Sequence, residues 1–302
     1  MELNHLDERP DTLWHYTDAN GLLGILKNQR SGSSGYFPKF WATAIEYLND
    51  HRELTFGLEY LKLRILELVD RLEKTTYEDD EPHIIVNIPG KVEFLRSICV
   101  TIDKVVERTY PIHIHCYTTS FSRCGDVLSQ WRAYGSGTNG FSIGIDAAKL
   151  PRPDLGHPLR PGPQLAKVEY GHSLPQDFTE DLYKRLSGFL NRTEPPSTSD
   201  GMMDQQLAWM ASIAARIKHQ GFEEEEEWRY ITSRFDGLCH RASATGLVPY
   251  VTWGLEPEAI VGLKVGPGPM QEENRRSAQS LLQELGYTAA ASNIEKSRTP
   301  FR

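Results

Sequence analysis

Two short segments, far apart in the sequence, constrain the fold of this chain most strongly. Residues 13–17 read Leu-Trp-His-Tyr-Thr and run directly into an apolar stretch that Asp18 is placed to cap as a helix. Residues 223–231 begin with five glutamates and continue as Trp-Arg-Tyr-Ile, which is typical of a buried strand. The first segment predicts a strand that carries a histidine, and the second predicts a strand that begins with carboxylates.

Hydrophobic periodicity predicts a mixture of helices and strands around these segments. Apolar residues spaced by fours and threes from Leu54 to Leu72 predict a long amphipathic helix, and residues 91–108 predict a second one. These two helices form a predicted helical insertion at about residues 50–110. Strands scattered among helices, with no long linker, predict one α+β domain over residues 1–302. The other predicted strands are residues 36–43, 113–122, 141–145, 166–170, 228–233, 247–253, 260–265 and 287–292, and the other predicted helices are residues 182–190, 203–218 and 271–285, with a short helix near Trp131.

Composition and charge narrow the classes of function. A net charge of −8 argues against a broad basic surface that grips duplex nucleic acid. No apolar run approaches the roughly 18 residues of a membrane span, and the first residues lack the basic and apolar regions of a secretory signal. We therefore expect a cytoplasmic protein without membrane contact, whose four cysteines are reduced thiols.

The common catalytic and metal-binding motifs do not occur in this sequence. It contains no GxxxxGK[ST] loop, no GxGxxG fingerprint, no GxSxG elbow and no HExxH helix. His113 and His115 lie two residues apart, a spacing that can bind a metal on a strand. Cys124, together with His157 or His172, would have to join them through the fold, so we expect no metal.

The acidic run offers carboxylates beside a strand. Because successive side chains of a strand point to opposite faces, Glu225, Glu227 and Arg229 are predicted to share one face. On that face Arg229 would pair with a carboxylate or a phosphate. Glu223 and Glu224 are better explained as the solvated end of the preceding helix, and the choice between Glu225 and Glu227 stays open.

Several islands of the sequence form one ordered set: residues 13–17 with Gly21, Leu22, Ile25 and Leu26, then Asn49-Asp50 with Glu53, and then residues 117–122, 130–134, 140–145, 225–231 and 296–302. In that order they resemble the bacterial family called domain of unknown function 2971. The resemblance brings no activity with it.

The strand–histidine–helix unit and the late Glu-x-Glu pair are also similar to the ADP-ribosyltransferase fold. This resemblance implies a split, mainly antiparallel sheet of that type and NAD as a substrate. Cleavage of NAD passes through an oxocarbenium-like sugar, so a carboxylate beside C1′ lowers the barrier. By this resemblance Glu227, with Glu225 as the other candidate, supplies the catalytic carboxylate, and His15 holds the ribose next to nicotinamide.

The same cleft needs further contacts to the dinucleotide. Tyr16 and Thr17 are second choices for contacts to the ribose or the amide, and Ser120 resembles the small hydroxyl of the second strand in the transferase fold. Trp131 and Tyr134 lie one helical turn apart, so they are predicted either to wall the nicotinamide ring or to pack in the core. The group Asn49, Asp50 and Glu53 reads as a helix cap with its first-turn acid, or as a rim of the site.

The leading hypothesis is an NAD-consuming ADP-ribosyltransferase or NAD glycohydrolase, a kind of enzyme that serves as a toxin or a phage-defence effector. The acceptor is left open among a protein, a nucleic acid, a small molecule and water. One alternative is a nonenzymatic module that senses a nucleotide in the same cleft. The other is a metal-dependent nuclease or phosphoesterase whose acidic run binds a divalent cation.

Overall fold

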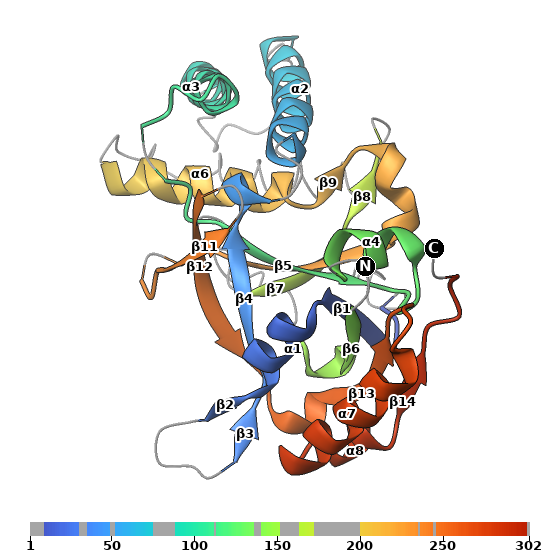
Figure 1. Cartoon of the computed structure of the whole chain (residues 1–302). Coiled ribbons are helices and arrows are strands. Elements are labelled where there is room, and N and C mark those ends of the chain that lie inside the picture. Colours follow the sequence, from blue (N-terminus) through green and yellow to red (C-terminus); the bar gives the residue numbers. More distant parts are fainter. Residues whose placement is uncertain are drawn as a thin grey trace.

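A ten-stranded sheet forms the centre of the computed structural model, which describes residues 9–29, 35–48, 52–74, 88–111, 113–135, 140–151, 163–171, 200–234, 236–243 and 246–300. The strands run in the order β11-β12-β4-β5-β1-β6-β13-β14, and β10 and β7 continue the sheet from the other edge of β5. All its strand pairs are antiparallel except β13 with β14. The coarse expectation of an α+β fold with a mainly antiparallel sheet is therefore confirmed (Figure 1).

The strands of the large sheet are β1 (Thr12–Thr17), β4 (Lys39–Ala44), β5 (Tyr117–Ser122), β6 (Phe141–Asp146), β7 (Gln164–Lys167), β10 (Glu227–Thr232), β11 (Cys239–Ser243), β12 (Gly246–Gly254), β13 (Ile260–Val265) and β14 (Ile294–Lys296). Two small two-stranded sheets accompany it. One joins β2 (Asn28–Gln29) to β3 (Tyr36–Phe37), and the other joins β8 (Glu169–Tyr170) to β9 (Ile217–Lys218).

The large sheet is split at the middle of β5. One edge of β5 pairs with β10 over the whole length of both strands. The other edge of β5 is shared by two strands. At one end of β5, β1 pairs only at Trp14–Ser122, and at the opposite end β4 pairs at Thr43–Thr118 and Ala44–Tyr117. Residues 119–121 pair with neither of these strands, so β1 and β4 diverge from each other along this edge.

The helix α1 (Ala19–Leu26) begins at the split, directly after β1. The Asp18 carboxylate accepts a hydrogen bond from the Gly21 amide at 2.7 Å, which confirms the predicted helix cap. The buried side of α1 packs into the main core with Leu22, Ile25 and Leu26.

A layer of helices covers one end of the sheet and contains a second core. The layer consists of α2 (Glu53–Lys74), α3 (Ile88–Val106) and α6 (Asp200–Ala214), which lie together in Figure 1. The apolar seam predicted for the first helix is confirmed, since Leu54, Leu58, Leu61 and Ile65 are all buried. Among the described residues every helix is too short or too polar to span a lipid bilayer.

The C-terminal region corrects one prediction. Residues 287–292, predicted as a closing strand, instead contain the helix α8 (Thr288–Ala291), which follows α7 (Gln271–Glu284). The physical reason is the run of three alanines, which favours helix more than strand. The closing strand is β14, which forms just beyond this helix and pairs in parallel with β13.

Other elements also differ from the predictions. The strand predicted from residue 113 begins only at Tyr117, because His113 and the Ile114 amide are bound by the Glu46 carboxylate instead of a neighbouring strand. The helix predicted over residues 203–218 ends at Ala214, and its last residues form β9. The strand β11 was not predicted. The helix predicted at residues 182–190 lies outside the described residues, and the single-domain assignment stays a prediction.

We expect Leu61→Ala to destabilise the protein by about 3 kcal/mol, because it leaves a cavity in the second core. Leu61 is fully buried, whereas Leu63 on the same helix is 55% exposed and provides the matched control. Urea denaturation of both variants measures the difference. Equal losses for Leu61→Ala and Leu63→Ala would contradict this packing of α2.

Candidate functional site

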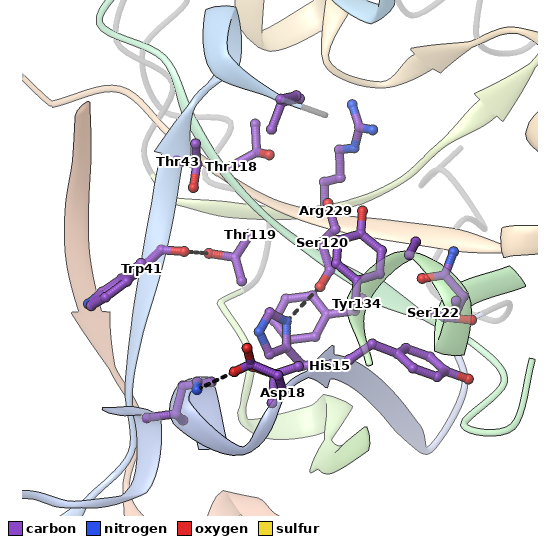
Figure 2. A pocket seen from close by; sticks show the side chains of 18 of the residues that line it. His15, Asp18, Trp41, Thr43, Thr118, Thr119, Ser120, Ser122, Tyr134 and Arg229 are labelled. Atoms are coloured by element: carbon purple, nitrogen blue, oxygen red, sulfur yellow. Dashed lines mark hydrogen bonds between the residues drawn. The ribbon is translucent and has the colours of Figure 1, made fainter. Parts of the chain in front are cut away.

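A cleft of about 850 Å³ opens at the split of the sheet (Figure 2). Its walls come mainly from β1, α1, β4, β5, β10, β11 and the short helix α4 (Leu128–Tyr134). The volume lies within the range of small-molecule and cofactor sites. Because segments from the beginning, middle and end of the chain meet here, the cleft is the leading candidate for the functional site.

The floor of the cleft is a polar face of the sheet. Ser122 lies opposite Glu227, and Ser120 lies opposite Arg229, in the pairing of β5 with β10. Residues opposite each other in neighbouring strands share a face, so these four side chains point to the same side. Thr118 extends the same face along β5 by the alternation of the strand.

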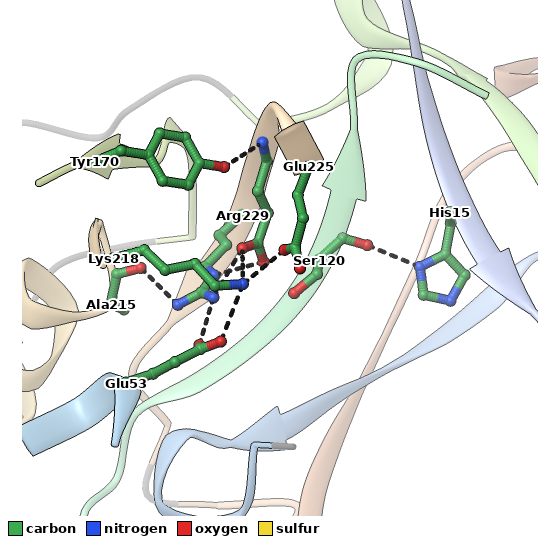
Figure 3. Close-up of polar contacts among 9 residues, drawn as sticks. His15, Glu53, Ser120, Tyr170, Ala215, Lys218, Glu225 and Arg229 are labelled. Carbon is green, nitrogen blue, oxygen red and sulfur yellow. Dashed lines mark hydrogen bonds and ion pairs between the residues drawn. The ribbon is translucent and has the colours of Figure 1, made fainter. Parts of the chain in front are cut away.

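A buried ion-pair cluster occupies one end of this floor (Figure 3). Arg229 contacts both carboxylate oxygens of Glu227, through Nε at 2.7 Å and through Nη2 at 2.9 Å. The same Nη2 donates to Glu53 Oε2 at 2.6 Å, and Nη1 donates to the Ala215 carbonyl at 2.9 Å. The Arg229 side chain is 2% exposed, so its four interactions take the place of water.

Lys218 ties a third carboxylate to the cluster. Its Nζ lies 2.6 Å from Glu225 Oε2, 3.0 Å from Glu53 Oε1 and 3.1 Å from Glu227 Oε2. Three carboxylates thus face two cations, which leaves one formal negative charge in the cluster. A net negative charge at the wall of a cleft favours a ligand group that is positive or becomes positive.

The two glutamates of the acidic run differ in protonation behaviour. Burial raises the pKa of Glu225 above its ordinary value, and Lys218 opposes this shift. Burial also acts on Glu227, but the charges of Arg229 and Lys218, with hydrogen bonds from Arg229 and Ser120, outweigh it and lower the pKa of Glu227 to about 2. The pKa of Glu225 therefore lies above that of Glu227, and Glu225 takes up a proton first as the pH falls.

His15 lies in the split itself. Its Nδ1 is 2.9 Å from the Ser120 carbonyl, which pairs with neither β1 nor β4, so the imidazole replaces a missing strand partner. Burial lowers the pKa of His15, and the hydrogen bond to Ser120 opposes this only in part. A neutral ring that donates from Nδ1 carries its lone pair on Nε2, for which the described residues offer no hydrogen-bond partner.

His15 and the glutamates line the same cleft but lie on opposite sides of β5. Trp14 pairs with Ser122, so Trp14 shares the face of Glu227, and His15 points to the other face. Figure 3 shows Ser120 between the imidazole and the cluster. A ligand that contacts both groups must therefore extend through the split.

The structure separates the two aromatic residues of α4. Tyr134 is 37% exposed and lines the cleft, whereas Trp131 is 3% exposed and is not part of the lining. The Trp131 indole donates to Asp126 at 2.8 Å and packs edge-on against Tyr16. Burial, together with the nearby negative charge of Glu227 and Glu225, raises the pKa of Tyr134 to about 12.

The remaining predicted contacts are mostly engaged within the protein. Tyr16 is 6% exposed, and its hydroxyl donates to the Cys124 carbonyl at 2.8 Å and accepts from the Val127 amide at 3.0 Å. Thr17 lines the cleft at the end of β1. The histidine pair at residues 113 and 115 lies outside the cleft lining, and no group of three or more potential metal ligands occurs among the described residues. Asn49 and Asp50 lie outside the described residues.

Sequence reasoning missed two members of the cluster. The sequence pattern predicts a helix cap or a rim for Glu53 and a helix for Lys218. Glu53 reaches the cluster because Gly57, one turn later, lets α2 approach α6 so closely that an added Cβ would lie 2.4 Å from the Ala214 carbonyl. The sequence signal that was available is this glycine inside an otherwise regular amphipathic helix.

We expect Glu227→Gln to lose about 3 kcal/mol of stability at pH 7, because the pKa of the buried Glu227 falls from about 4.3 in the unfolded chain to about 2 in the folded protein. A carboxyl whose pKa is lower in the folded protein stabilises the fold at every pH above its pKa in the unfolded chain. This contribution to stability disappears as the pH falls through the pKa that Glu227 has in the folded protein. The wild type and Glu227→Gln should therefore converge in urea stability between about pH 4.5 and pH 2.

The exposed neighbour Glu224 supplies the control for this titration. Glu224→Gln should follow the wild type at every pH. A difference between the wild type and Glu227→Gln that stays constant from pH 7 to pH 2 would contradict the ion-paired state of Glu227.

Comparison with known proteins gives one match. Residues 130–230 match the model of a family described as "Protein of unknown function (DUF2971)". No curated protein and no solved structure matches the chain. The matched stretch runs from Gln130 on α4 to Tyr230 on β10 and includes Lys218, Glu225 and Glu227, so it supports the resemblance to this family over the acidic half of the cleft.

Proposed function

We propose that this protein breaks the bond between nicotinamide and ribose in NAD and transfers the ADP-ribose to an acceptor or to water. The observation that carries the proposal is the ion-pair cluster, in which three carboxylates face two cations at the wall of a cleft of about 850 Å³. Negative charge in a partly closed site stabilises positive charge that develops on a bound sugar.

The proposed reaction needs charge stabilisation more than an external base in its first step. The bond between C1′ and the pyridinium nitrogen breaks, and its electron pair leaves with nicotinamide. The ribose then carries positive charge at C1′ and the ring oxygen, as in glycoside hydrolysis. A hydroxyl or another nucleophile of the acceptor forms the new bond at C1′ and gives its proton to a base.

Glu225 is the better candidate for the carboxylate beside C1′. Its side chain is 19% exposed, against 5% for Glu227, and Lys218 is its ion-pair partner. Its raised pKa also suits a group that accepts the proton of the acceptor. Glu227, held on both oxygens by Arg229, is assigned to positioning Arg229 and Lys218.

The other side chains of the cleft have supporting roles in this proposal. The free Nε2 of His15 accepts a hydrogen bond from a ribose hydroxyl, and the exposed ring of Tyr134 packs against the nicotinamide. The split between β1 and β4 supports an arrangement of the ADP-ribosyltransferase type. The cytoplasmic location and the role as a toxin or phage-defence effector belong to this proposal and rest on the kind of enzyme alone.

A second candidate function is a binding module that senses a nucleotide without consuming it. The pairing of Glu227 with two cations favours this candidate, because a neutralised carboxylate stabilises positive charge poorly. The metal-dependent nuclease gains no support from the described residues, because the three carboxylates of the cluster are paired with Lys218 and Arg229 and no group of three or more side chains there could hold a metal ion.

We expect purified protein to release nicotinamide from NAD, and Glu225→Gln to slow this release roughly 100-fold, because the variant loses the charge beside C1′. Chromatography of nicotinamide, with and without cell lysate as a source of acceptors, measures the rate. Glu224→Gln, which changes an exposed neighbour in the same acidic run, should keep the wild-type rate.

Calorimetry with NAD separates the two candidate functions. Saturable binding without nicotinamide release under all acceptor conditions would remove the enzymatic proposal and leave the sensing module. If Glu225→Gln releases nicotinamide at the wild-type rate, the role assigned to the Glu225 carboxylate is wrong.

A further inference from the structure

The end of the cleft formed by β4 and β11 carries the opposite charge to the cluster end. Lys39, Trp41 and Thr43 alternate along β4 and therefore share a face. Arg241 on β11 lies opposite Val248 on β12. Two residues further along β12, Tyr250 lies opposite Thr43 on β4, so Arg241 and Thr43 point to the same face of the sheet. Lys39, Trp41, Thr43 and Arg241 all line the cleft.

The two cations on this face, Lys39 and Arg241, have no carboxylate partner among the described residues. The guanidinium of Arg241 lies 5.6 Å from the centre of the Trp41 ring, and its Nη2 makes one long contact of 3.4 Å to the Thr43 hydroxyl. The buried Nε of Arg241 has no hydrogen-bond partner within the described part of the chain. A planar guanidinium with unused donors is suited to bind a phosphate.

A buried hydroxyl on the Arg241 side of β4 points to the same chemistry. Thr118 lies opposite Thr43 in the pairing of β4 with β5, and Figure 2 shows the two side chains next to each other. Thr118 is 3% exposed, lines the cleft, and its hydroxyl has no hydrogen-bond partner among the described residues. An unpaired buried hydroxyl is costly, and a ligand oxygen at this point removes the cost.

We infer that Arg241 and Thr118 form a phosphate-binding subsite, which holds the phosphate groups of a nucleotide. Trp41 is 46% exposed at this end and supplies a plane for stacking a base. Thr118 and Ser122 lie four residues apart on β5, which is about 13 Å along a strand. This inference rests on the proposed function. One bound dinucleotide would place its phosphates in this subsite and its reacting ribose at the acidic end of the cleft.

Calorimetric titration with ADP, adenosine and pyrophosphate tests the subsite without any need for turnover. We expect the wild type to bind ADP at least tenfold more tightly than adenosine, with the difference shrinking as salt is added. Arg241→Gln and Thr118→Val should each weaken ADP binding about tenfold and leave adenosine binding unchanged. Arg241→Lys, which keeps the charge, should recover part of the loss.

Two controls separate binding from folding. Arg276→Gln changes an arginine on α7 whose side chain is 72% exposed and that lies outside the cleft lining, so it should bind ADP like the wild type. Thr118→Val removes a hydroxyl that has no partner, so its Tm should not fall. A lowered Tm for Thr118→Val would show that the hydroxyl serves folding and would overturn its assignment to a ligand.

The remaining outcomes are distinct for the subsite and for the proposed reaction. Equal affinity of the wild type for ADP and adenosine, or ADP binding unchanged in Arg241→Gln, would overturn the subsite. Pyrophosphate binding that depends on Arg241 would support it with the phosphates alone as ligand. If ADP binding depends on Arg241 but NAD is not turned over, the subsite stands and the proposed reaction is overturned. If NAD is turned over and its KM is unchanged in Arg241→Gln, the reaction stands and the subsite is overturned.

Discussion

The buried guanidinium of Arg229 is the interaction on which the rest of the site depends. It joins Glu227 on its own strand, Glu53 on α2 and the Ala215 carbonyl after α6, so one side chain links the sheet to the helical layer. A charge this deeply buried is stable only when every donor is satisfied. The three partners therefore fix where α2 and α6 sit, and with them the wall of the cleft.

The second constraint is the split of the sheet. Where β1 and β4 leave β5, backbone groups lose their strand partners, and side chains replace them. His15 bonds to the Ser120 carbonyl, and the Thr119 hydroxyl donates to the Trp41 carbonyl at 3.0 Å. The same separation that exposes these groups makes room for a ligand, so the cleft and the fixed orientation of the imidazole have one physical origin.

Local patterns in the sequence predicted the local structure well. The cap at Asp18, the apolar seam of α2 and the shared face of Glu227 and Arg229 all follow from spacing alone. Glu225 does not belong to the strand, because Glu226 adopts a left-handed conformation with φ of 40° and ends a 3₁₀ helix. The partnership of Glu53 and Lys218 depends on contacts between distant segments, and the burial of Trp131 depends on how a seven-residue helix packs. No periodicity encodes such contacts.

The central claim is that Glu225 keeps an available carboxyl while Glu227 is locked by Arg229. Carbon-13 NMR titration of labelled glutamates, with Glu225→Gln to assign the signal, tests this claim most directly. The account predicts that the carboxyl signal lost in Glu225→Gln titrates above the ordinary glutamate pKa of about 4.3, because burial raises the pKa of Glu225. A Glu225 signal that titrates below the ordinary value, together with that of Glu227, would contradict it.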